Sequence, residues 1–182
     1  MATLFVDKID PQSGTSLTIG SSGDTVALTS GVVQSNILYP AFLIYKNSNQ
    51  SISEATDTKV TWDAESIDTD NAFASDKFTV PSGKAGKYMF NGSIQTSSVG
   101  QSEYQYGLCM IWKNGSRLTS QMFDNRNHNL RQIPIVFNFL TDLAVNDYIE
   151  IYINLGTSAA DQRIGGDSNY IGTWFSGYRI GT

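Results

Sequence analysis

The dipeptide Asn114-Gly115 joins two runs of alternating residues, and it constrains the fold more than any other part of the sequence. Asn-Gly readily adopts the positive-φ backbone of a type I′ turn, whose twist matches that of the flanking strands. Residues 103–123, EYQYGLCMIWKNGSRLTSQMF, therefore predict a β-hairpin. No window of the sequence shows the sustained apolar period of about 3.6 residues that a helix needs. We expect an all-β chain.

Further strands are predicted from about residue 38 to the end of the chain. They are short apolar or alternating runs, spaced at regular intervals: LYPAFLIY (38–45), KVTW (59–62), KFTV (77–80), KYMFNGSI (87–94), IPIVFNFL (133–140), DYIEIYINL (147–155) and YIGTWFSGYRI (170–180). Such spacing is typical of a sandwich, a barrel or a jelly roll. We therefore predict that residues 37–182 form one all-β domain of one of these three kinds.

Residues 1–36 differ from the rest in composition, because they are small, polar and repetitive. Ser-Gly dipeptides recur on either side of two short alternating segments, 17–19 and 26–28. Two apolar residues per segment cannot bury a core, and repeats of this kind become stable by stacking on copies of themselves. We predict that residues 1–36 form a β-repeat stem that helps to trimerise the chain. A disordered linker is the alternative.

The charge and the composition exclude several classes of partner. Charged residues make up 16% of the chain, against roughly 25% in an average soluble domain. A formal charge of −5 argues against unspecific binding to nucleic acid or to an anionic membrane. The first apolar run stops at Asp7, so we expect neither a signal peptide nor a transmembrane span. This predicts synthesis in a cytoplasm.

Catalytic and metal-binding patterns are weak. The sequence has one histidine, His128, which lies in the polar segment DNRNHNLR. Its single cysteine, Cys109, excludes an intramolecular disulfide and is predicted to be a small buried hydrophobe. No two His or Cys residues have metal-ligand spacing, and no glycine-rich phosphate loop follows a strand. We therefore expect no enzyme activity, no cofactor and no metal.

The segment DAESIDTDN places four carboxylates close together: Asp63, Glu65, Asp68 and Asp70. Oxygen-rich loops can hold calcium, but this spacing matches no calcium-loop pattern and favours a solvated acidic turn. The pairs Asp63/Glu65 and Asp68/Asp70 are also the sequence-local candidates for the paired carboxylates of a polysaccharide depolymerase.

Two strands are apolar on both faces, LYPAFLIY and TWFSGYRI. In the second, Phe175 and Gly177 point one way, whereas Trp174, Ser176 and Tyr178 point the other. One face of each strand in a two-layer sandwich should meet water. Strands that avoid water on both faces need a second partner, which indicates an obligate oligomer.

The order and spacing of several motifs resemble the globular head of the complement first-component q chain, in the tumour-necrosis-factor-like jelly-roll superfamily. The resemblance covers residues 38–181, and it implies that residues 37–182 form an antiparallel jelly-roll sandwich. The matching positions are Ala41-Phe42; Phe78, Thr79, Val80 and Pro81; Gly86, Tyr88 and Phe90; Asn114-Gly115; Asn146-Asp147; and Phe175-Ser176-Gly177. Three departures stand out: extra residues between Pro81 and Gly86, Asn146 in place of glycine, and no collagen-like Gly-X-Y stalk.

The resemblance implies a homotrimer around a threefold axis, with the last strand in the sheet that faces the axis. The residues it places at the trimer interface are Phe42, Tyr45, Trp174, Phe175, Gly177 and Tyr178. On this interpretation Gly177 is a glycine because three backbones approach one axis.

The stem resembles the repetitive N-terminal segments of bacteriophage fibre and spike proteins. This implies a non-catalytic virion protein, a tail fibre, spike or capsid decoration, held to other virion proteins by residues 1–36. Its head would bind a glycan or protein of the host cell surface through two polar segments, 123–131 and 156–169. The candidate contact residues are Asp124, Asn125, Arg126, His128, Asp161, Arg163 and Asp167. The alternatives are a soluble lectin-like trimer and a fibre-borne depolymerase.

Overall fold

A computed structural model describes residues 9–14, 17–25, 30, 39–98, 104–125, 132–157 and 162–181. The chain divides into two compact units, Met1–Ser35 and Asn36–Thr182. In the first unit the described residues form turns and no strand. Leu17 and Ile19 are 45% and 65% exposed, and none of the described strands pairs with them. The strand predicted at 17–19 is thus absent from the single chain, and the one predicted at 26–28 lies outside the described residues.

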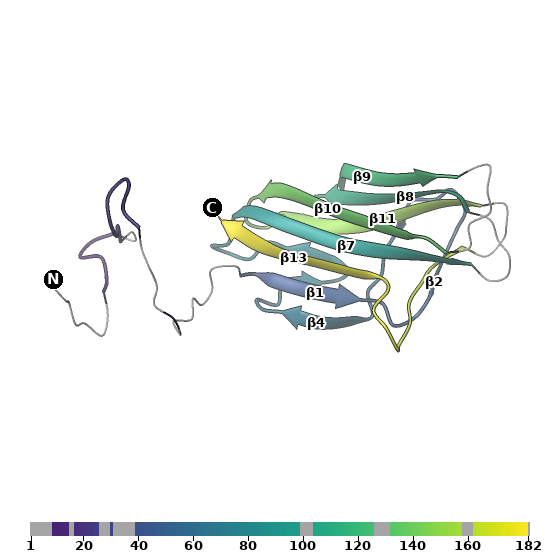
Figure 1. Ribbon diagram of the computed structural model, residues 1–182, viewed down its shortest axis with the longest axis horizontal. Coiled ribbons are helices and arrows are strands. Elements are labelled where there is room, and N and C mark those ends of the chain that lie inside the picture. The colour runs from purple at the N-terminus through teal and green to yellow at the C-terminus, as the bar shows by residue number, and fades with distance from the viewer. Residues whose placement is uncertain are drawn as a thin grey trace. The chain divides into compact units, whose positions relative to one another are not determined.

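The second unit is a sandwich of two antiparallel sheets (Figure 1). The described residues contain no helix, so the predicted all-β antiparallel fold is confirmed. The first sheet has the order β2 (Gln50–Ile52), β12 (Gln162–Ile164), β7 (Gly86–Ser98), β13 (Trp174–Gly181), β1 (Ala41–Tyr45) and β4 (Ala64–Asp68), and β10 (Pro134–Leu143) also pairs with β7. The second sheet has the order β5 (Phe73–Ala74), β6 (Lys77–Thr79), β11 (Tyr148–Thr157), β8 (Tyr104–Lys113) and β9 (Ser116–Asp124), and β3 (Thr58–Lys59) also pairs with β11.

Aromatic rings fill the space between the two sheets. Phe42 stacks on Phe78 with ring centroids 5.0 Å apart, and it meets the edge of Phe175 at 4.9 Å. All three side chains are buried, and Phe90 joins the same cluster. Stacked and edge-to-face pairs at these distances are favourable beyond the apolar area they bury. The aromatic faces of β1, β6, β7 and β13 therefore hold the sheets together.

The second sheet contributes the aliphatic part of the core. Ile149, Ile151 and Ile153 are fully buried on one face of β11, as their alternation predicts. Cys109 on the neighbouring β8 is also fully buried, which confirms its predicted role as a small hydrophobe. Burial raises the pKa of the Cys109 thiol, so this group stays neutral and unreactive.

The predicted hairpin at Asn114-Gly115 is present, and it joins β8 to β9. Both residues have positive φ, 53° and 78°, as a type I′ turn requires. Asn146 also has a positive φ, 70°, and it stands where the resembled family has glycine. Asparagine tolerates the left-handed region better than most residues, so this departure keeps the backbone conformation of the turn.

Candidate functional site

The surface of the first sheet that points away from the second sheet carries many apolar side chains. We call this surface the outer face. Cross-strand pairing sets its rows: Tyr178 lies opposite Ala41 and Met89. Directly opposed residues share one side of a sheet, so each row extends across the strands. The apolar and aromatic residues of the outer face are Ala41, Leu43, Tyr45, Ile67, Met89, Val136, Leu140, Trp174 and Tyr178. A polar row crosses the same face, in which Ser176 lies opposite Asn91 and Asn91 lies opposite Asn138.

A groove of about 560 Å³ lies on the outer face, where β4, β1 and β13 run side by side (Figure 1). Its walls include Leu43, Trp174 and Tyr178. Two further wall residues are large hydrophobics that remain about half exposed, Ile67 at 47% and Ile171 at 49%. A monomeric sandwich normally presents polar residues on such a surface. Contiguous exposed apolar area of this kind marks an interaction site.

The structure divides the predicted interface residues between two sides of the sheet. Tyr45, Trp174 and Tyr178 lie on the outer face. Phe42 and Phe175 instead point into the core, where they contact each other and are almost completely buried. Their side chains serve the packing of one chain and offer little surface to a neighbour.

The structure gives Gly177 an explanation that lies within one subunit. A Cβ at this position would lie 2.5 Å from Cδ1 of Phe90 and 2.8 Å from Cε1 of Phe42. Real Cβ atoms essentially never come so close to another side chain. Gly177 is therefore a glycine because two rings of its own subunit occupy the space that a side chain would need, whatever lies on the other side of the sheet.

The sequence interpretation did not place several outer-face residues at the interface, among them Leu43, Ile67, Val136 and Leu140. The last two are 62% and 58% exposed on β10. The run IPIVFNFL contained a signal for these two residues, because Val136 and Leu140 stand beside apolar positions that alternate along the strand. The run alone does not show which strands lie beside it in the sheet. The surface to which its outward-pointing residues belong could therefore not be predicted.

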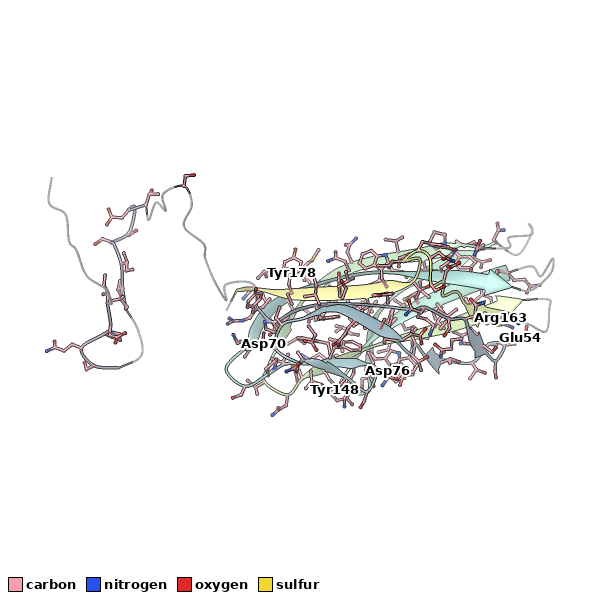
Figure 2. All side chains as sticks on the ribbon, turned by 90° about the horizontal axis from the view of Figure 1, so that it is seen from below. Glu54, Asp70, Asp76, Tyr148, Arg163 and Tyr178 are labelled. Atoms are coloured by element: carbon pink, nitrogen blue, oxygen red, sulfur yellow. The ribbon has the colours of Figure 1, made fainter. Side chains whose placement is uncertain are left out.

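The predicted contact residues that the structure describes lie near one end of the head. Asp124 ends β9, the amide N–H of Asn125 donates to the carbonyl of Gln105 at 2.7 Å, and Arg163 lies in β12. This end is opposite the end where β1 begins and β13 finishes (Figure 1). Figure 2 likewise places Arg163 far from Asp70. Arg126, His128 and Asp161 lie outside the described residues.

Asp167 belongs to the connection between β12 and β13. Its carboxylate accepts hydrogen bonds from the backbone N–H of Asn169 at 2.8 Å and from the Asn169 side chain at 3.0 Å. The bonds close a local turn within the polar segment. One oxygen of the Asp167 carboxylate therefore already accepts hydrogen bonds from within its own loop.

The acidic segment is built into the head by internal hydrogen bonds. Asp63 Oδ2 accepts the backbone N–H groups of Asn47 at 2.8 Å and Ser48 at 2.9 Å, and Lys46 Nζ lies 3.5 Å from Oδ1. Burial acts to raise the pKa of the Asp63 carboxyl, but the hydrogen bonds from Ser48 and the charge of Lys46 outweigh it and hold the pKa below its ordinary value. Asp63 therefore works as a structural anion.

Two further carboxylates of this segment accept local hydrogen bonds. Asp68 accepts the backbone N–H groups of Ala72 at 2.9 Å and Phe73 at 3.0 Å. Asp70 accepts the hydroxyl of Thr69 at 2.9 Å. Among the residues that the structure describes, no group of three or more His, Cys, Asp or Glu side chains could hold a metal ion. No described helix is long and apolar enough to cross a membrane.

Comparison with solved structures identifies the fold. The chain is similar to the globular domain of zebrafish complement 1qA protein, with a TM-score of 0.52 and 15% sequence identity. The match covers 78% of this chain and 97% of that domain. The predicted resemblance is thus confirmed at the level of the fold. No family model and no curated protein matches the sequence. The likeness of residues 1–36 to phage fibres stays a prediction.

Proposed function

We propose that this protein is a homotrimeric structural protein of a bacteriophage particle, whose head binds the host cell surface without catalysis. The observation that carries the proposal is the apolar outer face and its groove on a jelly-roll head. A surface that holds Ile67, Ile171, Val136 and Leu140 in partly exposed positions is unfavourable in water. Association with sister subunits removes it from water.

A trimer explains why the terminal strand is so rich in large side chains. Trp174 and Tyr178 on β13 border the groove, and Leu43 of β1 lies between them and Ile67 of β4. Obligate interfaces bury on the order of 2,000–5,000 Å² and resemble a hydrophobic core cut in half. The similarity to the complement 1qA globular domain supports the same arrangement, since the resembled superfamily forms trimers through this sheet.

Host attachment is supported by the polar end of the head. The end of β9 and the start of β12 lie there, away from the end where the chain enters β1 (Figure 1). Binding residues commonly lie on loops held by a rigid scaffold. A stem that anchors the chain on its N-terminal side leaves this polar end available for a glycan or a protein of the host.

A binding role fits the described carboxylates better than a depolymerase does. A glycosidase needs one carboxyl group as the acid and a second as the base or nucleophile. Asp63 and Asp68, one member of each candidate pair, instead accept backbone N–H groups that hold the local chain in place. Incubation of the pure protein with host polysaccharide should therefore leave the chain length unchanged.

Two measurements test the proposal. Light scattering of the full chain at micromolar concentration should give three times the 19.9 kDa subunit mass, and a 20 kDa particle would rule out the trimer. Electron microscopy of particles labelled with an antibody against the head should place it at the tail or on the capsid. Labelling of neither, or secretion of the protein as a free trimer, would favour the soluble lectin-like alternative.

A further inference from the structure

A second pocket, of about 340 Å³, lies at the open edge of the sandwich, between β4 of one sheet and β5 of the other. Its floor is apolar and is made by Ile44, Trp62 and Phe73. Its volume is at the small end of the roughly 300–1,000 Å³ range of ligand sites. This edge pocket is separate from the groove on the outer face.

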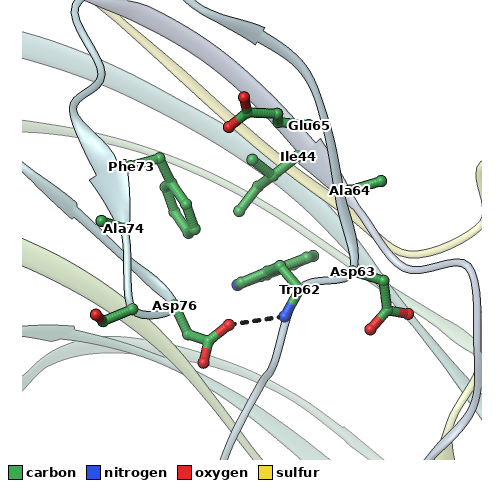
Figure 3. Close-up of a pocket in the computed structure, with 9 residues that line it drawn as sticks. Ile44, Trp62, Asp63, Ala64, Glu65, Phe73, Ala74 and Asp76 are labelled. Atoms are coloured by element: carbon green, nitrogen blue, oxygen red, sulfur yellow. Dashed lines mark hydrogen bonds between the residues drawn. The ribbon is translucent and has the colours of Figure 1, made fainter.

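Local bonds hold the walls of the edge pocket in place. Ser75 and Asp76 form the turn between β5 and β6, with φ values of 53° and 58°. Asp76 Oδ1 accepts the backbone N–H of Trp62 at 2.9 Å, as Figure 3 shows. Lys59 Nζ donates to the carbonyl of Ser75 at 2.8 Å. The turn is therefore tied to the segment that carries the indole, and the pocket is formed before any ligand arrives.

Aromatic faces and carboxylates meet in this pocket. Figure 3 shows the rings of Phe73 and Trp62 between the carboxylates of Glu65 and Asp76. Glu65 pairs with Ile44 across β4 and β1, so both lie on the side of the sheet that faces the second sheet. Among the described residues, Glu65 has no hydrogen-bond or ion-pair partner.

The two lysine side chains near the pocket already have partners. Lys46 Nζ is buried and donates to the carbonyl of Thr61 at 2.8 Å. Lys59 Nζ forms an ion pair with Glu150 at 2.8 Å. The edge pocket consequently keeps an excess of negative charge over an aromatic floor. Such a site attracts a cation and repels anions such as phosphate or an acidic sugar.

The indole of Trp62 is packed on one side by Phe175, with ring centroids 6.0 Å apart. Its Nε1 is buried without a hydrogen-bond partner among the described residues. The ring can therefore shift slightly toward a ligand without breaking a hydrogen bond of its nitrogen. The electron-rich face of an indole is the strongest of the protein aromatic groups for binding an organic cation.

We infer that the edge pocket binds a small organic ammonium ion, with its alkyl groups against Trp62 and Phe73 and its charge balanced by Glu65 and Asp76. The aromatic floor favours an alkylated ammonium ion over a hydrated metal ion. The alkyl groups make apolar contacts with the rings, and the ring quadrupole attracts the positive charge. The inference does not depend on the proposed role in host attachment or on the trimer.

Choline is the probe that tests the site. The full-length protein is titrated with choline, and proton–nitrogen correlation NMR follows the three tryptophan indole signals, of which Trp62 is assigned by its loss in Trp62→Phe. The Trp62 signal should shift saturably, with a dissociation constant in the range of about 0.1–5 mM. The neutral isostere of choline, in which a carbon replaces the nitrogen, should produce no saturable shift.

Two charge variants complete the experiment. Glu65→Gln removes a wall charge and should weaken choline binding about tenfold, whereas Glu54→Gln removes an exposed charge outside the pocket and should change binding less than about twofold. The labelled Glu54 lies toward the other end of the head from Asp70 (Figure 2). Equal binding of the neutral isostere, equal binding by Glu65→Gln, or no shift up to about 20 mM choline would overturn the inference.

Discussion

The ring of Phe90 occupies the space directly beside Gly177, so that a Cβ on the glycine would lie 2.5 Å from Phe90 Cδ1. The two residues face each other across β7 and β13, where their Cα atoms are paired. The contact lies within one subunit. It ties the glycine of the terminal strand to the aromatic core and makes it a requirement of the fold.

Gly177→Ala should therefore destabilise the head itself. The added methyl group has to displace Phe90 or Phe42, and overpacking of this kind costs about 1–3 kcal/mol. The free energy of unfolding, measured by urea denaturation, should fall by this amount. Gly181→Ala on the same strand is the control, since a Cβ there meets nothing within 4 Å. Loss of the oligomer with unchanged unfolding would instead restore the axial explanation.

Tyr178→Glu should dissociate the trimer while leaving each head folded. The Tyr178 side chain is about one-third exposed in the single chain and borders the groove, so a carboxylate is tolerated by the monomer but would be buried unpaired in an interface. Light scattering should report the single-chain mass, and circular dichroism should keep the β-sheet signal. Ser51→Glu adds the same charge on the exposed side of β2 and should remain trimeric. A trimer that survives Tyr178→Glu would place the interface elsewhere.

The long strands and the central hairpin were predictable because local signals specify them. Asn114-Gly115 sets its own turn, and the alternation of Ile149, Ile151 and Ile153 identifies the buried face of β11 without knowledge of its neighbours. The resemblance added the jelly-roll order of the strands. These elements needed no information from distant parts of the chain.

The remaining elements depend on contacts between distant residues. Three described strands that were not predicted, β2, β5 and β12, have only two or three residues, which is too short for a pattern. The sequence likewise could not show that Gly177 faces the core. That orientation is recognised from the rings of Phe42 on β1 and Phe90 on β7, which lie beside the glycine. The edge pocket was not predicted because Glu65 lies in one sheet and Asp76 beside the other. The two residues line one pocket only in the folded sandwich.

Asp147→Asn should destabilise the head at neutral pH and lose this effect in acid. Asp147 accepts Lys113 Nζ at 2.9 Å, Asn114 Nδ2 at 2.7 Å and the Ala144 N–H at 2.8 Å. Burial acts to raise the pKa of Asp147, but these hydrogen bonds, that from Lys113 first, hold it below its ordinary value. A carboxyl whose pKa is lower in the folded state stabilises fully above its unfolded pKa of about 3.9, and this stabilisation is lost as the pH falls through the folded pKa.

Urea denaturation at two pH values checks this prediction. Asp147→Asn should lower the free energy of unfolding by about 1–2 kcal/mol at pH 7, and the difference from wild type should shrink as the pH is lowered below about 3.9. Asp142→Asn is the control, because its pair with Lys87 at 3.4 Å is between two exposed side chains. Exposed pairs contribute about 0–1 kcal/mol. A pH-independent loss in Asp147→Asn would mean that the geometry of the turn matters and its charge does not.

Removal of residues 1–35 should leave a folded and trimeric head. The buried aromatic and aliphatic core lies within Asn36–Thr182, and so does the whole outer face. The urea midpoint of the truncated chain should therefore match that of the full chain, and light scattering should still give three subunits. Because the stem is proposed to anchor the protein, the truncated chain should no longer enter phage particles when it is supplied in place of the full chain. A truncated head that is folded but monomeric would show that the first 35 residues, and not the outer face, hold the subunits together.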